Sequence, residues 1–155
     1  MKALKLLTVI VLISSIAFVS CKKENDDSGD PSTGNGTMSL VYGGTSWTAT
    51  LDVQGIKTGN TIVVTGTDSN SKQAQVQLTD VTKIGTYGVN AGNTLRWTES
   101  TSPTDSFMAN AMFGSGTITV SELTDTKIVG TFSFTGFSAG GTTRVITDGK
   151  FNVEF

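Results

Sequence analysis

The sequence predicts an all-β domain, an antiparallel meander of about nine to eleven strands, and three observations support this fold class. Apolar and polar side chains alternate with a period of two, which is typical of strands that bury one face and expose the other. Glycine, serine and threonine are abundant and proline is scarce, a composition that suits short strands joined by tight turns. From residue 38 onwards, no stretch repeats apolar residues at helical spacing for the length that a helix needs.

Five segments show the alternation clearly, and each predicts a strand with one inward face. They are WTATLDVQ at 47–54, QAQVQLT at 73–79, FMANAMF at 107–113, TITVS at 117–121 and FNVEF at 151–155. Because successive side chains on a strand point to opposite sides, every second residue is expected to face the core. The expected inward residues are Trp47, Ala49, Leu51 and Val53; Ala74, Val76 and Leu78; Phe107, Ala109, Ala111 and Phe113; Ile118 and Val120; and Phe151, Val153 and Phe155.

Short turn sequences separate the predicted strands. Examples are GGTS at 43–46, KTGN at 57–60, DSNSK at 68–72, NAGN at 90–93 and SAGG at 138–141. Glycine and asparagine supply the positive φ angles that hairpin turns need, and short connections favour an up-and-down path. A sheet of this many strands protects its edges by closing into a barrel or by folding into a flattened two-sheet β-sandwich, and we favour the barrel-like form.

The first twenty residues predict a signal peptide. Lys2 and Lys5 precede an apolar run from Leu6 to Val19, and the small residue Ser20 follows it. A run of about 14 residues rises roughly 21 Å as a helix, which is too short to span a hydrocarbon core of about 30 Å. We therefore expect residues 1–20 to be removed from the mature chain.

The only cysteine of the chain follows directly. The stretch Phe18-Val19-Ser20-Cys21 resembles the lipobox of bacterial lipoproteins, and this resemblance implies that the Cys21 thiol is acylated. A lone thiol in an oxidising compartment is otherwise free to form unwanted disulfides. Two or three acyl chains hold a protein on a membrane, whereas a single chain binds only marginally. The alternative is a free or intermolecularly paired cysteine.

A polar tether is expected between the cysteine and the domain. Residues 22–37, KKENDDSGDPSTGNGT, contain no apolar side chain larger than proline, so this segment cannot bury enough surface to fold. The predicted organisation is thus a signal peptide at 1–20, a lipidated cysteine and tether at 21–37, and an all-β domain at 38–155. Glu24, Asp26 and Asp27 resemble the acidic export tags of some surface lipoproteins.

The C-terminal strands carry a second resemblance. GSGTITVSE, KIVGTFSFTGF and TDGKFNVEF, with GTSWTA and GTYGV before them, resemble a family of small secreted bacterial lipoproteins whose domain has no assigned function. The resemblance covers residues 38–155 and implies an all-β domain behind a lipoprotein signal, but it identifies no catalytic or binding residue. We expect an outer-membrane lipoprotein of the cell envelope, facing the periplasm or exposed on the surface.

The side chains present exclude several kinds of chemistry. The chain has no histidine, which excludes Ser-His-Asp and Cys-His nucleophile systems and His-ligated zinc. A glycosidase needs two carboxylates on either side of a cleft, and Asp52, Glu99, Glu122 and Glu154 are the candidates for this unfavoured alternative. Calcium could bind Asp68 with Asn70, or Glu24, Asp26 and Asp27, but a plain turn is the favoured interpretation. No catalytic residue, cofactor or metal is expected.

We therefore expect a non-enzymatic module that binds an unknown ligand or has a structural role in the cell envelope. Without Lys2 and Lys5, 9 basic and 13 acidic side chains remain in no basic stripe, so nucleic acid is not an expected partner. Trp47 and Trp97 share parity with apolar neighbours and are expected in the core. Phe137 has the opposite parity to Phe132 and Phe134 and stands at a strand end, which makes it the candidate ligand contact.

Two alternatives for the ligand site follow from side-chain size. Phe137 predicts a surface contact for a glycan, a small molecule or an envelope protein. Small inward residues such as Ala49, Ala74, Ala109 and Gly130 indicate either tight packing or an interior cavity for a small apolar ligand, as in lipocalin-like carriers.

Overall fold

The computed structural model describes residues 36–155, so Cys21, the predicted signal peptide and residues 22–35 of the predicted tether lie outside the described residues. Among residues 36–155, no helix has the length and hydropathy to cross a membrane. The described elements are β1 (Gly36–Tyr42), β2 (Thr45–Thr48), β3 (Asp52–Thr58), β4 (Thr61–Thr67), β5 (Gln73–Leu78), β6 (Gly85–Gly88), β7 (Thr94–Thr98), the 3-10 helix η1 (Pro103–Asp105), β8 (Ser106–Ala109), β9 (Ser115–Leu123), β10 (Lys127–Phe137) and β11 (Thr143–Glu154). β1 begins two residues before the expected domain start at Met38.

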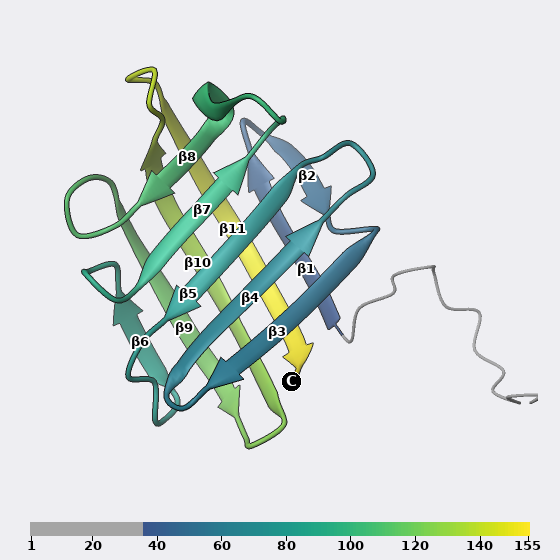
Figure 1. The fold of residues 1–155 in the computed structure, drawn as a ribbon, viewed down its shortest axis with the longest axis vertical. Helices are drawn as coiled ribbons and strands as arrows, with labels where there is room; N and C mark the ends of the chain where they lie inside the picture. Colours follow the sequence, from purple (N-terminus) through teal and green to yellow (C-terminus); the bar gives the residue numbers. More distant parts are fainter. Residues whose placement is uncertain (1–35) are drawn as a thin grey trace, which may run out of the picture.

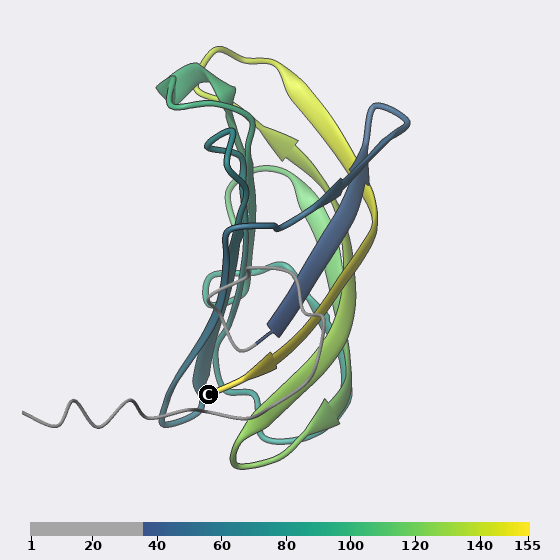
Figure 2. The same cartoon turned by 90° about the vertical axis from the view of Figure 1, so that its right-hand side faces the viewer.

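One antiparallel sheet contains all eleven strands. Its main path runs β2-β1-β11-β10-β8-β7-β5-β4-β3, and β9 pairs with β10 while β6 pairs with β9. The sheet curls back on itself, so that β3, β4, β5, β7 and β8 face a curved layer of β1, β11, β10, β9 and β6 (Figures 1 and 2). The predicted all-β, barrel-like fold is confirmed.

The path departs from a simple meander at β6. β5 pairs with β7 instead of β6, and β6 crosses to the opposite layer beside β9. The linking loop is held by Val81, which is buried and donates its backbone N–H to the carbonyl of Asn60. β6 has the sequence GTYG, in which Tyr87 alone is half-buried, so it has little apolar surface to bury at a central position.

The predicted strand over 47–54 is interrupted by a corner. Trp47, Ala49 and Val53 are buried as expected, but Leu51 is 51% exposed, so its predicted inward direction is wrong. The backbone N–H groups of Thr50 and Leu51 both donate to the carbonyl of Thr67. Two successive donors on one acceptor are typical of a bulge, which breaks the alternation between β2 and β3.

The predicted strand over 107–113 ends early. β8 stops at Ala109, and the Asn110 side chain accepts hydrogen bonds from the backbone N–H groups of Met112 at 2.8 Å and Phe113 at 3.2 Å. This turn directs the chain away from the sheet, so Ala111 and Phe113 are exposed. Their predicted inward direction is therefore wrong. The remaining expected inward residues are buried, except Phe155, which is half-buried.

Small residues in the interior are covered by large ones. A Cβ atom on Gly130 would lie 2.5 Å from Cζ of Phe151, and one on Gly66 would lie 2.8 Å from the sulfur of Met38. Phe151 and Met38 are almost completely buried in the core cluster that also holds Trp97. These contacts favour the tight-packing interpretation of the small inward residues over an interior cavity.

Candidate functional site

Phe137 lies where the sequence places it, on the outer surface. It is the last residue of β10 and is 40% exposed, whereas Phe132 and Phe134 of the same strand are buried. Its ring lines a surface groove of about 500 Å³, which we call the Phe137 groove. The lining residues are Pro103, Ser106, Met108, Phe113, Phe137, Ser138 and Ala139.

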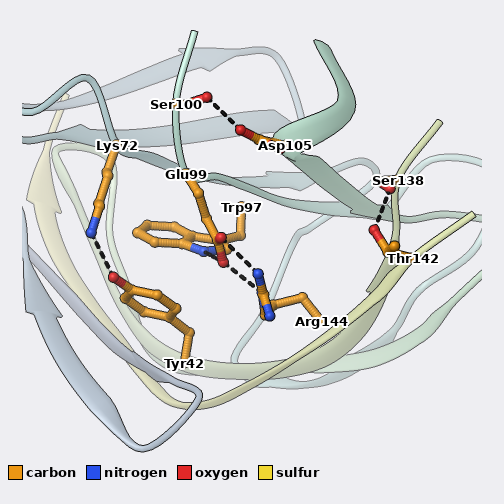
Figure 3. Close-up of polar contacts among 9 residues, drawn as sticks. All are labelled: Tyr42, Lys72, Trp97, Glu99, Ser100, Asp105, Ser138, Thr142 and Arg144. Atoms are coloured by element: carbon orange, nitrogen blue, oxygen red, sulfur yellow. Dashed lines mark hydrogen bonds and ion pairs between the residues drawn. The ribbon is translucent and has the colours of Figure 1, made fainter. Parts of the chain in front are cut away.

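The Phe137 groove forms at a change of neighbouring strands. β9 pairs with β10 up to Thr135, and β8 takes its place at Phe137, which pairs with Met108. The Asn110 turn brings Phe113 to one side, and the loop at 138–142 closes the other through a hydrogen bond of 2.8 Å between the hydroxyls of Ser138 and Thr142 (Figure 3). Five of the seven lining residues are apolar, so the groove wall is mostly apolar.

A second groove of about 500 Å³ adjoins the first, and the two share Pro103 and Ser106. We call it the Arg96 groove. Hydroxyl and amide side chains dominate its wall, which also contains one arginine. The lining residues are Leu51, Thr67, Asp68, Ser69, Ser71, Gln73, Arg96, Thr98, Ser100, Thr101, Ser102, Pro103 and Ser106.

Strand register connects the two grooves in cross-strand rows. One row on the outer face consists of Gln75, Arg96, Met108 and Phe137, from β5, β7, β8 and β10 in turn. The adjacent row consists of Thr67, Gln73, Thr98 and Ser106, from β4, β5, β7 and β8. The first row passes from an amide through a cation to a thioether and an aromatic ring, while the second is polar throughout.

Arg96 stands out because it has no partner. Within residues 36–155 its side chain makes no hydrogen bond or ion pair, and its Nε is buried without an acceptor. A buried donor without an acceptor is unfavourable, so this arrangement does not add to the stability of the fold. Arg96 was not among the residues singled out from the sequence, although its alternation with Leu95 and Trp97 indicates that it faces outward.

The inner side of the same end of the barrel is closely paired (Figure 3). Glu99 accepts from Arg144 Nη2 at 2.7 Å, lies 2.6 Å from Arg144 Nε, and accepts from Trp97 Nε1 at 3.1 Å. Lys72 Nζ donates to the hydroxyl of Tyr42 at 2.6 Å, and the Tyr42 ring lies 4.9 Å from that of Trp97. We call these five residues the inner cluster.

Two cations of the inner cluster have raised pKa values. The hydrogen bond to Glu99 raises the pKa of Arg144, and the hydrogen bond to Tyr42 raises the pKa of Lys72, both above their ordinary values. The Arg144 guanidinium also lies 4.9 Å from the ring centre of Phe107 in β8. The inner cluster thus joins β1, β7, β8 and β11 beneath the strands that carry Arg96 and Met108.

Asp68 is occupied by the turn around it. One carboxylate oxygen accepts from Trp47 Nε1 at 2.9 Å, and the other accepts from the backbone N–H groups of Asn70 and Lys72 at 2.8 and 2.9 Å. Burial raises the pKa of Asp68, but these hydrogen bonds lower it by more, so the pKa lies below its ordinary value of 3.8. The carboxylate therefore shapes the turn between β4 and β5.

The four carboxylates considered for glycosidase chemistry have separate surroundings. Glu99 is paired with Arg144, and Glu122 lies 3.2 Å from Lys127. Glu154 is exposed at the end of β11, and Asp52 is half-buried at the start of β3. In the described part of the chain, no three His, Cys, Asp or Glu side chains lie close enough to hold a metal ion.

Comparison with known proteins identifies the family to which this chain belongs. No curated protein and no solved structure matches the chain. A family model described as a domain of unknown function matches residues 35–153. This range includes all of the described strands except the last residue of β11, Glu154. The chain therefore belongs to this family, DUF6252.

Proposed function

We propose that this protein is a lipid-anchored carbohydrate-binding module of the bacterial cell envelope, without catalytic activity. The predicted acylation of Cys21 supports the anchor, and the Phe137 and Arg96 grooves support the binding surface. The absence of histidine from the sequence and the pairing of Glu99 and Glu122 support a role in binding instead of catalysis.

The observation that carries the proposal is the position of the grooves relative to the tether. Gly36 pairs with Val153 near one end of β11, whereas Phe137 pairs with Thr143 at the other (Figure 1). Ten residues of strand separate these pairs, which corresponds to about 33 Å. Gly36, the first described residue, therefore lies at the end of the domain remote from the grooves, so an anchor that precedes it in the chain would let the domain present the grooves away from the membrane.

Carbohydrate is the ligand that fits both grooves together. A sugar ring has an apolar C–H face, which packs on an aromatic ring, and hydroxyl groups at its edge, which need hydrogen-bond partners. Phe137 supplies an exposed ring, and Thr67, Gln73 and Thr101 supply polar groups that make no side-chain hydrogen bond within residues 36–155. Residues 22–35 contain no large apolar side chain, so the tether does not suit the Phe137 groove.

The binding function is tested on a glycan array with the mature chain, residues 21–155, carrying Cys21→Ser so that it stays in solution. We expect binding to a defined set of glycans and about tenfold weaker binding by Phe137→Ala, since the ring supplies the apolar contact. Ile56→Ala is the matched control, because Ile56 is 58% exposed on β3 and lies outside both grooves. No bound glycan, or equal binding by Phe137→Ala, would contradict the proposal.

The anchor is tested separately in cells. Mass spectrometry of the mature protein should find acyl chains on Cys21, and Cys21→Ser should move the protein from the membrane to the soluble fraction. A free thiol at position 21 in the native protein would contradict the anchor and leave the array result unaffected.

A further inference from the structure

We propose that the carbohydrate bound at this surface is acidic, and that Arg96 binds its carboxylate or sulfate group. This inference rests on the proposed carbohydrate-binding function and specifies the chemistry of its ligand. It starts from a contrast in the structure: the Arg96 guanidinium, which has no partner within residues 36–155, lies in a groove whose other polar side chains are uncharged or already engaged.

Arg96 has the geometry that an oxyanion requires. Its neighbours across the strands, Gln75 and Met108, offer it no negative charge, and its Nε has no acceptor within residues 36–155. The two terminal nitrogens of the guanidinium, unlike Nε, are not buried, and their N–H donors match the two oxygens of a carboxylate or sulfate. A bound oxyanion would thus pair with these terminal donors, which have no acceptor within residues 36–155.

The acidic residues near the grooves do not compete for Arg96. The Asp68 carboxylate accepts three hydrogen bonds from Trp47, Asn70 and Lys72. Asp105 accepts from the Ser100 hydroxyl at 2.6 Å, and Glu99 is held by Arg144 on the inner side (Figure 3). Each of these carboxylates already has donors, so the positive charge of Arg96 remains available to a ligand.

The surroundings of Arg96 suit the rest of a sugar chain. Gln73 and Thr98 lie in the adjacent row, and Thr101 lines the same groove, so neutral donors and acceptors surround the cation. Arg96 and Phe137 are two strand spacings apart in their row, or about 10 Å. One chain can therefore place an acidic group on Arg96 and an apolar ring face on Phe137.

The test is calorimetric titration of the mature Cys21→Ser chain with three polysaccharides. Polygalacturonate carries carboxylates, dextran sulfate carries sulfates, and dextran is neutral. We expect at least one acidic polymer to bind about tenfold or more tightly than dextran, and binding to weaken as salt is added. Binding of polygalacturonate alone identifies the carboxylate, and binding of dextran sulfate alone identifies the sulfate.

Variants distinguish Arg96 from general charge attraction. Arg96→Gln should lose about tenfold or more in affinity for the acidic polymer, and Arg96→Lys should keep part of it, because lysine retains the charge without the paired donors. Lys150→Gln is the matched control, since Lys150 is an exposed cation of β11 outside both grooves. Circular dichroism confirms that each variant is folded.

The outcomes separate this inference from the proposed function. If Arg96→Gln binds the acidic polymers as the parent chain does, or if dextran binds as tightly as they do, the role of Arg96 is wrong and carbohydrate binding stands. If no glycan on the array and none of the three polymers binds, the proposed function itself is wrong.

Discussion

The two arginines at the groove end of the barrel have opposite surroundings. Arg144, from β11, donates a hydrogen bond from Nη2 to Glu99 and lies against the ring of Phe107. Its Nε is also buried without a hydrogen bond, but it lies 2.6 Å from the Glu99 carboxylate in an ion pair. Arg96, from β7, lies on the outer face with no partner within residues 36–155. The inner arginine joins strands of the two layers, whereas the outer one makes no hydrogen bond or ion pair within residues 36–155 that does so.

This contrast indicates how the end of the barrel is divided between stability and recognition. Trp97 and Arg96 are consecutive residues of β7, yet the first lies in the core against Tyr42 and Trp47 while the second lines a groove. The contacts of the inner cluster join the strands that carry the outer row, and a binding surface supported in this way needs little rearrangement when it binds. The following substitutions test this division.

The largest effect is expected at Trp97. Its side chain is fully buried, and its ring lies 4.9 Å from the rings of both Tyr42 and Trp47. Trp97→Ala should lower the free energy of unfolding by about 3–5 kcal/mol, measured by urea denaturation. Thr98→Ala, on the outer face of the same strand, is the control and should change it by less than about 1 kcal/mol. Similar losses for both variants would contradict the division.

A smaller, pH-dependent effect is expected at Trp47. Trp47→Phe removes the N–H donated to Asp68, and should cost about 2 kcal/mol at pH 7 because the acceptor is charged. Since the pKa of Asp68 is lowered on folding, its stabilising contribution is present above the unfolded value of 3.8 and is lost as the pH falls through the folded value. The difference between parent and variant should therefore narrow in acid.

Denaturation of four proteins across pH checks this linkage: the parent, Trp47→Phe, Asp68→Asn and the double variant. In the Asp68→Asn background, Trp47→Phe should show a cost that no longer depends on pH, because the titrating partner is gone. A pH dependence that persists in that background would assign the effect to another group.

Glu99 tests the inner cluster directly. Glu99→Gln removes the negative charge opposite Arg144, whose side chain is 38% exposed, so solvent limits the loss to about 1 kcal/mol. The effect should diminish with added salt in urea denaturation. Lys127→Gln, which breaks the more exposed pair with Glu122, should cost less than about 0.5 kcal/mol. If Glu99→Gln and Lys127→Gln lowered the free energy of unfolding equally, the inner position of the Glu99–Arg144 pair would add nothing to its stabilising effect.

Alternation along single strands predicted the directions of Trp47, Trp97 and Phe137 correctly, because a period of two depends only on neighbouring residues. It failed at Leu51 and Phe113, where a bulge and the Asn110 turn outweigh the local pattern. Turn chemistry decides such positions, and asparagine at 110 was the available signal.

The grooves could not be predicted in the same way. They depend on the pairing of Arg96 with Met108 and of Met108 with Phe137, which joins three strands through register. The crossing of β6 to β9 places β7 beside β5, and no local sequence pattern encodes that choice. The absence of a partner for Arg96 depends on every neighbouring side chain, so it became visible only in the folded structure.

The smallest effect on stability is expected at Arg96, and it is also the most informative. Arg96→Gln should change the free energy of unfolding by less than about 0.5 kcal/mol or raise it slightly, because it removes a buried donor that has no acceptor. Urea denaturation beside Glu99→Gln gives the comparison under the same conditions. A loss of stability as large as that of Glu99→Gln would mean that Arg96 supports the fold. Its lack of a hydrogen-bond or ion-pair partner within residues 36–155 would then no longer argue for a ligand. An unchanged stability together with a lost affinity for acidic polymers would assign Arg96 to recognition alone.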